Sequence, residues 1–290
     1  MPECTEPHRA TVTAMPSTSS SSASHSARSS ARSATNSHAV RVIARSGYAV
    51  NGLLHILIGV IALQLLLTGG ESTDADQSGA LQSLASTPFG GILLWIVTIG
   101  LAMLGLWLIV DGILQGPARD SKKKLVVGIV KGLVYLALAS TALSFALGGS
   151  SDSSGDTQSM TAQLMAAPAG IILVFLVGLV VLAVGGYFIH KGVTQGFRDD
   201  LSIPAGTAGT VITGLGVAGY VAKGVALLAV GGLFIAAAVT SDASGSTGLD
   251  GALRSLLALP FGVWILGLVG GGLIAYGVYC FARARYANLG

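Results

Sequence analysis

The chain has 290 residues, of which 52% are hydrophobic and only 10% are charged. Soluble domains usually carry about 25% charged residues, so this composition excludes an ordinary soluble domain and predicts a membrane protein. The formal net charge of +3 does not indicate a nucleic-acid partner, because the basic residues flank apolar segments and lack the context of a binding fold.

The N-terminal segment, residues 1–43, differs in composition from the rest. It is rich in Ser, Thr, Ala and Arg and has few large apolar side chains, so it cannot bury enough surface to offset the entropy of ordering. We predict a disordered cytoplasmic tail. Because no acidic residue lies between His8 and Arg45, an organellar transit peptide is an alternative, and so is a true start at Met15 or later.

After this tail, one pattern occurs three times at identical spacing. A glycine is followed, at the same distance each time, by a Pro-x-Gly and a long apolar run. The glycines are Gly52, Gly132 and Gly224, and the Pro-x-Gly motifs begin at Pro88, Pro168 and Pro260. The chain is therefore a tandem repeat, which we divide into repeat 1 (44–118), repeat 2 (119–198) and repeat 3 (199–285).

Each repeat contains two apolar stretches of about the 20 residues that a helix needs to cross a bilayer. Their aliphatic character is continuous rather than alternating, which excludes barrel strands. The predicted spans are 46–68, 89–115, 125–147, 169–191, 211–240 and 261–283. The expected fold is all-α, with six transmembrane helices arranged as three tandem hairpins around a pseudo-threefold axis along the membrane normal.

Charge predicts the orientation of these hairpins. The segments between the two spans of each repeat contain seven acidic residues and one base, Arg254; the acids are Glu71, Asp74, Asp76, Asp152, Asp156, Asp242 and Asp250. The other side carries bases beside five of the spans. By the positive-inside rule, both termini are expected in the cytoplasm and the chain in the plasma membrane.

Two features of the hairpins recur. Each proline of the Pro-x-Gly motif is expected in the first turn of the second helix, where its missing N–H costs nothing. Segments 79–84, 160–165 and 251–256 precede these motifs and have amphipathic spacing. We interpret them as lids that pack on the spans of their own hairpin, with a ligand-binding platform as the alternative.

Polar residues within the spans form a candidate intramembrane cluster. Its members are Asn51, His55, Asp111, Lys131, Lys191 and Lys223. An ionisable residue inside a membrane is a candidate site by default. One interpretation is structural: Asp111 neutralises Lys131 or Lys223, and the lysines extend to the headgroups. The alternative is a proton or ion path through Asp111, His55 and His190.

Tyrosines at the helix ends, such as Tyr279, are expected to be interfacial anchors.

The chemistry motifs of common enzyme classes do not occur in a suitable context. We therefore expect no catalytic, cofactor or metal site, and the two cysteines, Cys4 and Cys280, offer neither a disulfide framework nor a metal set. The expected partner is the lipid bilayer. The predicted function is that of a non-enzymatic structural or accessory component of the cell envelope; the alternative is a small proton or cation transporter or channel.

Several motifs resemble a known family. The run from Ala44 to His55, its counterpart from Gly219 to Gly224, and the Pro-Phe-Gly motifs are similar to the bacterial membrane family catalogued as domain of unknown function twelve-oh-six. The resemblance implies three two-helix repeats and no known activity, substrate or catalytic residue. Repeat 2 departs most from the pattern, with Pro168-Ala169-Gly170 in place of Pro-Phe-Gly.

Overall fold

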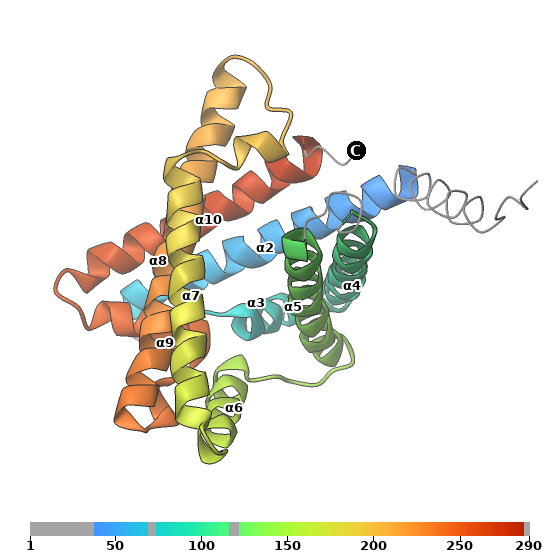
Figure 1. The fold of residues 1–290 in the computed structure, drawn as a ribbon. Coiled ribbons are helices and arrows are strands. Elements are labelled where there is room, and N and C mark those ends of the chain that lie inside the picture. Colours follow the sequence, from blue (N-terminus) through green and yellow to red (C-terminus); the bar gives the residue numbers. More distant parts are fainter. Residues whose placement is uncertain (1–37, 69–73, 116–121, 287–290) are drawn as a thin grey trace, which may run out of the picture.

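The computed structural model describes residues 38–68, 74–115 and 122–286, which form helices and short connections (Figure 1). The long helices are α2 (His38–Thr68), α4 (Gly90–Gln115), α5 (Lys122–Ala146), α7 (Gly170–Val193), α8 (Thr207–Thr240) and α10 (Gly262–Tyr286). Short helices lie within the hairpins: α3 (Gln77–Ala85), α6 (Ser153–Ala166), η3 (Ala243–Gly245) and α9 (Gly248–Leu257), with η2 (Arg198–Asp200) between repeats 2 and 3. The predicted tail lies mostly outside the described residues.

All six long helices are long and apolar enough to cross a membrane, so the predicted all-α, multi-pass fold is confirmed. The membrane-spanning stretches of these helices agree with the predicted spans to within a few residues, and the largest difference is in α8, where the stretch begins at Thr207. Helix α2 itself begins earlier than its span, at His38. We call the side that carries the loops within repeats the hairpin side. The side on which the described chain begins and ends is called the terminal side.

The long helices pack most extensively in pairs that join different repeats. These pairs are α2 with α10, α4 with α5, and α7 with α8 (Figure 1). The second helix of each repeat therefore packs on the first helix of the next repeat, and the last helix returns to the first. This arrangement gives the pseudo-threefold symmetry that the sequence repeat predicted.

Equivalent glycines explain why these pairs, which we call seams, are so close. A Cβ atom added to a seam glycine would lie within 2.9 Å of the carbonyl oxygen of a glycine on the facing helix. The glycine pairs are Gly52 with Gly277, Gly105 with Gly132, and Gly185 with Gly224. Small residues allow membrane helices to approach until their backbones touch. The first glycine of the sequence repeat is thus a seam residue in all three copies.

Contacts within the hairpins are less regular. Helices α8 and α10 of repeat 3 pack on each other, as do α2 and α4 of repeat 1, whereas α5 and α7 of repeat 2 make almost no contact. The spans of α5 and α7 are each only 17% buried, against 39–50% for the other four spans. The hairpin of repeat 2 is therefore open.

The Pro-x-Gly motif acts differently from the prediction. The second helices begin at Gly90, Gly170 and Gly262, so each proline lies two residues before its helix rather than in the first turn. The glycine N–H donates to the carbonyl of the residue before the proline at 2.8–2.9 Å, which forms a β-turn with proline in its second position. A Cβ on the glycine would collide with a carbonyl oxygen at the end of the preceding short helix. The motif therefore ends one helix and starts the next.

The interior has two parts. The larger part is aliphatic and includes Leu54, Ile58, Leu65, Leu101 and Leu273, which are almost completely buried. The smaller part lies towards the terminal side and is aromatic, with buried Phe197, Tyr220, Tyr276 and Tyr279. Three polar side chains of the predicted cluster, those of Asn51, His55 and Lys223, lie where these two parts meet.

Candidate functional site

Lys223 lies at the centre of the polar cluster on α8. Its neighbour Gly224 forms the seam with α7. The Lys223 Nζ atom is 3.2 Å from His55 Nε2 on α2, and it lies 4.6 Å from the ring centre of Tyr276 and 5.4 Å from that of Phe188. The amine is therefore surrounded by groups from α2, α7 and α10, and aromatic faces attract its positive charge.

The hydrogen bonds of His55 assign its tautomer. His55 Nδ1 is 2.8 Å from the carbonyl oxygen of Asn51, and a carbonyl can only accept, so Nδ1 carries the proton. Nε2 is then an acceptor for the Lys223 ammonium. The assignment follows from the hydrogen-bond network. The pair therefore carries one positive charge, which resides on the Lys223 ammonium.

Asn51 completes this group. Its side-chain amide donates to Cys280 Sγ on α10 at 3.6 Å, and both residues are buried. His55 also packs on Tyr276, with ring centres 4.8 Å apart. We call Asn51, His55, Lys223, Tyr276 and Cys280 the basic–aromatic cluster. Its members come from repeats 1 and 3 and tie the α2–α10 seam to α8.

Two more cations lie beside the cluster, nearer the terminal side. The Arg283 guanidinium lies 4.6 Å from the ring centre of Tyr48, and its Nη1 donates to the Tyr220 hydroxyl at 3.5 Å. Lys191 Nζ lies 5.7 Å from the ring centre of Tyr220. These contacts place the positive charges of α7 and α10 against tyrosine faces.

Sequence reasoning missed the part that aromatic residues play. Tyr279 is completely buried, with its ring 5.3 Å from that of Phe197, so the expectation of an interfacial anchor is wrong for this residue. The available signal was the repeat itself, because Tyr48 and Tyr220 occupy equivalent positions three residues before Asn51 and Lys223. An aromatic residue one turn from a buried polar residue lies on the same helix face.

The other predicted members lie elsewhere. Asp111 is half-buried on α4, next to Gly112, which meets Gly128 of α5. Lys131 is exposed on α5. Lys223 pairs with His55 rather than with Asp111, and His55 contacts Asn51 and Lys223 rather than Asp111 or His190. A path through Asp111, His55 and His190 stays a prediction.

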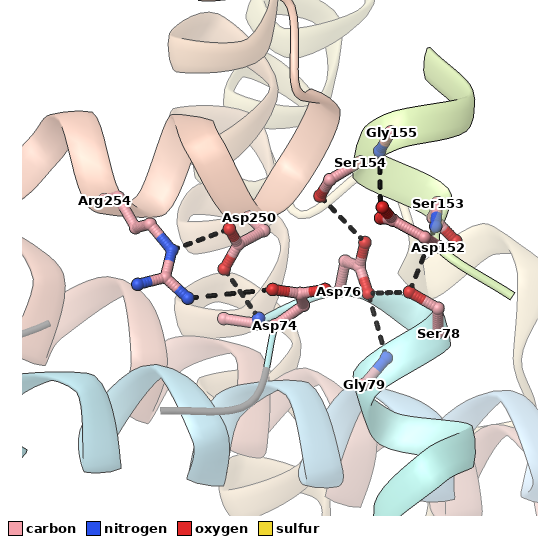
Figure 2. Close-up of polar contacts among 11 residues, drawn as sticks. Asp74, Asp76, Ser78, Gly79, Asp152, Ser153, Ser154, Gly155, Asp250 and Arg254 are labelled. Carbon is pink, nitrogen blue, oxygen red and sulfur yellow. Dashed lines mark hydrogen bonds and ion pairs between the residues drawn. The ribbon is translucent and has the colours of Figure 1, made fainter. Parts of the chain in front are cut away.

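On the hairpin side, a second polar network joins the repeats (Figure 2). Asp250 of repeat 3 accepts from the Ala75 N–H at 2.8 Å and from Arg254 Nε at 2.7 Å. Arg254 Nη2 also lies 3.8 Å from Asp74 Oδ1. Repeat 3 therefore holds the segment that leads into α3 of repeat 1.

Repeat 2 contacts the other side of the same segment (Figure 2). The Ser153 N–H donates to Ser78 Oγ at 3.3 Å, and Ser154 Oγ lies 3.5 Å from Asp76 Oδ2. Asp76 is 2% exposed and caps α3 by accepting from the Gly79 N–H at 3.0 Å. The short helices therefore interlock across repeats, in addition to packing on their own spans as predicted.

The pKa values of Asp74 and Arg254 in this network are both raised, but by different causes. Burial raises the pKa of Asp74, and the nearby carboxylates of Asp250, Asp76 and Asp152 raise it further. The hydrogen bond to Asp250 raises the pKa of Arg254, which keeps the guanidinium charged. In the described part of the chain, no group of three or more His, Cys, Asp or Glu side chains is arranged to hold a metal ion.

Comparisons with known proteins agree with the threefold repeat. The model of a family described as Domain of Unknown Function (DUF1206) matches residues 46–115, 126–195 and 218–287. The chain is also 31% identical over 256 residues to "Uncharacterized protein YxxB" of Bacillus subtilis (strain 168), in an alignment that covers 86% of this chain and 92% of that protein. No solved structure matches the chain. The family resemblance inferred from the motifs is confirmed.

Proposed function

We propose that this chain, which belongs to the family described as Domain of Unknown Function (DUF1206), is a non-enzymatic structural or accessory component of the cell envelope. The observation that carries this proposal is the packed interior. Between the basic–aromatic cluster and the hairpin side, most of the buried side chains are aliphatic, including Leu54, Ile58, Leu65 and Leu101, although Thr98 of α4 is also buried there. Such a core stabilises a rigid bundle, and in the described part of the chain it offers few polar groups to a substrate or an ion.

The polar groups that the bundle does contain support the same proposal. Asn51, His55 and Lys223 bond to one another or to Cys280, and the hairpin-side network joins all three repeats. Buried polar groups with partners fix one arrangement of the helices. Their effect here is to hold three hairpins in register.

We also propose that both termini face the cytoplasm. On the terminal side, described bases include Lys191, Arg198, Arg283 and Arg285, whereas the hairpin side carries Asp74, Asp76, Asp152, Asp156, Asp242 and Asp250. A reporter active only outside the cytoplasm should give signal when fused after residue 77, 155 or 246. Signal from a C-terminal fusion would contradict the proposed orientation.

A second candidate function, proton transport, is favoured by one observation. Lys223 and His55 form a hydrogen-bonded pair within the membrane and share one positive charge, and such residues often belong to proton relays. The positive charge at this point opposes passage of metal cations. Protons are therefore the species that this candidate would move.

Two measurements separate these functions. Vesicles that contain the purified chain should show no proton flux above empty vesicles under an imposed potential of either sign. In cells that lack the chain, tolerance of membrane stress should fall. It should be restored by the wild type and by the double variant His55→Leu/Lys223→Met, because a structural function does not need the shared proton.

The outcomes that contradict the structural function are distinct. One is a proton flux that the double variant abolishes. The other is failure of the double variant to restore stress tolerance although it reaches the membrane at the wild-type level and unfolds at a similar temperature. Either result would favour transport through the Lys223–His55 pair.

A further inference from the structure

We propose that the open hairpin of repeat 2 binds an anionic phospholipid, with its acyl chains between α5 and α7 and its phosphate at Lys223 and Lys131. The proposal is independent of the function proposed above. It also does not depend on which side of the membrane the termini face.

The first step concerns the helices that form the open hairpin. Helices α5 and α7 make almost no contact with each other, unlike the helices of the other two hairpins. Both carry exposed apolar side chains, among them Val130, Leu133 and Val134 on α5 and Leu176 and Val180 on α7. Within a bilayer, the space between two such helices is filled by apolar chains, because water does not enter the hydrocarbon region.

The second step concerns the charges at the terminal side of the hairpin. Lys131 lies one turn before Tyr135 on α5, and Tyr135 packs against the aliphatic core, so Lys131 lies on the inner face of α5. Lys223 lies over Phe188 of α7. One amine therefore borders each side of the open hairpin.

The third step is the bonding capacity of Lys223. Its ammonium has three donors. Among the described residues, its hydrogen-bond partner is His55 Nε2, it lies over the rings of Tyr276 and Phe188, and no carboxylate pairs with it. A phosphate oxygen would accept a charge-assisted hydrogen bond from this amine and would compensate its charge.

The depth of Lys223 and Lys131 along their helices agrees with the position of a lipid headgroup. Lys223 and Lys131 lie roughly 17 and 15 residues from the hairpin-side ends of α8 and α5, which is about 25 Å and 23 Å at ~1.5 Å per residue. The hydrocarbon core is ~30 Å thick, so both amines lie a few ångströms from its terminal-side boundary. The site is therefore apolar along most of its length and cationic at headgroup level, which is the polarity of an anionic lipid.

Charge also decides between occupants. A second copy that docks its own α5 and α7 in the same orientation would bring Lys131 and Lys191 of each chain together, and like charges repel. A free anion would gain nothing from the apolar faces of α5 and α7. An anionic phospholipid matches both the apolar and the cationic parts.

Native mass spectrometry of the full-length chain tests the proposal. The chain is purified in mild detergent and exchanged into an equal mixture of phosphatidylglycerol and phosphatidylcholine that have the same acyl chains. We expect retention of phosphatidylglycerol over phosphatidylcholine. The variant Lys131→Met/Lys223→Met should lose this preference by about thirtyfold, because each basic residue near the membrane surface contributes about fivefold.

Three controls keep the result specific. Arg198→Gln removes one exposed base from the same side but outside the hairpin, and it should keep the preference. Lys223→Arg keeps the charge and should also keep it. Inorganic phosphate at millimolar concentration should neither displace the lipid nor raise the unfolding temperature.

Several outcomes would overturn the proposal. Equal retention of the two lipids by the wild type would do so even if the lysine variants failed to fold. So would an equal loss in Arg198→Gln, which would indicate general surface charge. Displacement by phosphate alone would indicate a free-anion site, and a dimer that excludes lipid would indicate a second copy as the occupant.

Discussion

The contacts between repeats differ from the contacts within them. At the seams, glycines such as Gly185 and Gly224 bring helix backbones together in all three pairs, whereas within the hairpins the packing varies from close in repeat 3 to almost absent in repeat 2. The covalent repeat is therefore not the unit of packing. The difference teaches that stability in this bundle comes mainly from surfaces that one repeat cannot form alone, as in other repeat proteins.

The largest effect is expected from a seam glycine. A Cβ at Gly185 would lie 2.9 Å from the Gly224 carbonyl oxygen, whereas a Cβ at Gly186 meets nothing within 4 Å. Gly185→Val should therefore lower the free energy of unfolding by about 3 kcal/mol through overpacking, and Gly186→Val should change it far less. Thermal unfolding in detergent measures both. Similar losses in the two variants would show that helix propensity, rather than the seam, decides stability.

The next effect concerns the pair that links repeats 1 and 3. His55→Leu removes the acceptor of the Lys223 ammonium and should cost about 2 kcal/mol, because a partly buried charge loses its hydrogen bond. Adding Lys223→Met should recover much of this loss. A double-mutant cycle measures the coupling. If the two single substitutions lower the free energy of unfolding additively, the interaction between His55 and Lys223 does not contribute to stability.

A smaller effect is expected on the hairpin side. Asp250→Asn keeps an oxygen for the Ala75 N–H but removes the charge that faces Arg254, and it should cost about 1 kcal/mol. Asp242→Asn is the matched control, since the side-chain hydrogen bonds of Asp242 in the described structure go to Ser244 of its own loop. Its effect on the unfolding temperature should be smaller. A larger effect of Asp242→Asn would mean that contacts within a repeat matter more than contacts between repeats.

The smallest effect is expected from cutting the open hairpin. A protease site inserted between Gly149 and Ser150 separates α5 from α7, which barely touch, so the two fragments should stay together on gel filtration in detergent. The same cut combined with Gly52→Val should release them, because Gly52 faces Gly277 across the α2–α10 seam that joins the fragments. Separation after the cut alone would show that the loop carries the association.

Hydropathy and spacing were sufficient to predict the six helices and the threefold repeat, because helices and repeats are both visible in the local composition of the chain. They also singled out Gly52, Gly132 and Gly224. The partners of these glycines, on the second helices of neighbouring repeats, required the structure, since a small residue in a span does not say which helix it faces. The open hairpin of repeat 2 was not predicted either. Departures from the repeat pattern, such as Ala169 in Pro-x-Gly, showed only that repeat 2 is the most divergent.

For the candidate site, the sequence placed Asn51, His55 and Lys223 near one another through the alignment of repeats. It did not predict that Lys223 pairs with His55, which is distant in sequence, because the obvious partner of a lysine is an acid such as Asp111. The Pro-x-Gly interpretation was two residues off for a similar reason. Glycine is required at positions 90, 170 and 262 because a Cβ atom there would clash with a carbonyl oxygen of the preceding short helix. A prediction made one helix at a time does not include this contact between helices.

The return of α10 to α2 has a consequence for assembly. The seam is a heterologous, head-to-tail interface, and such interfaces form closed rings when their rotation permits. Here the rotation closes after three units, so the order of the repeats along the chain is not what holds them together. A circular permutant that begins with repeat 2 and joins repeat 3 to repeat 1 would keep all three seams. A single repeat with strict glycines at its two seam positions would carry both halves of the interface and would assemble as a cyclic homotrimer.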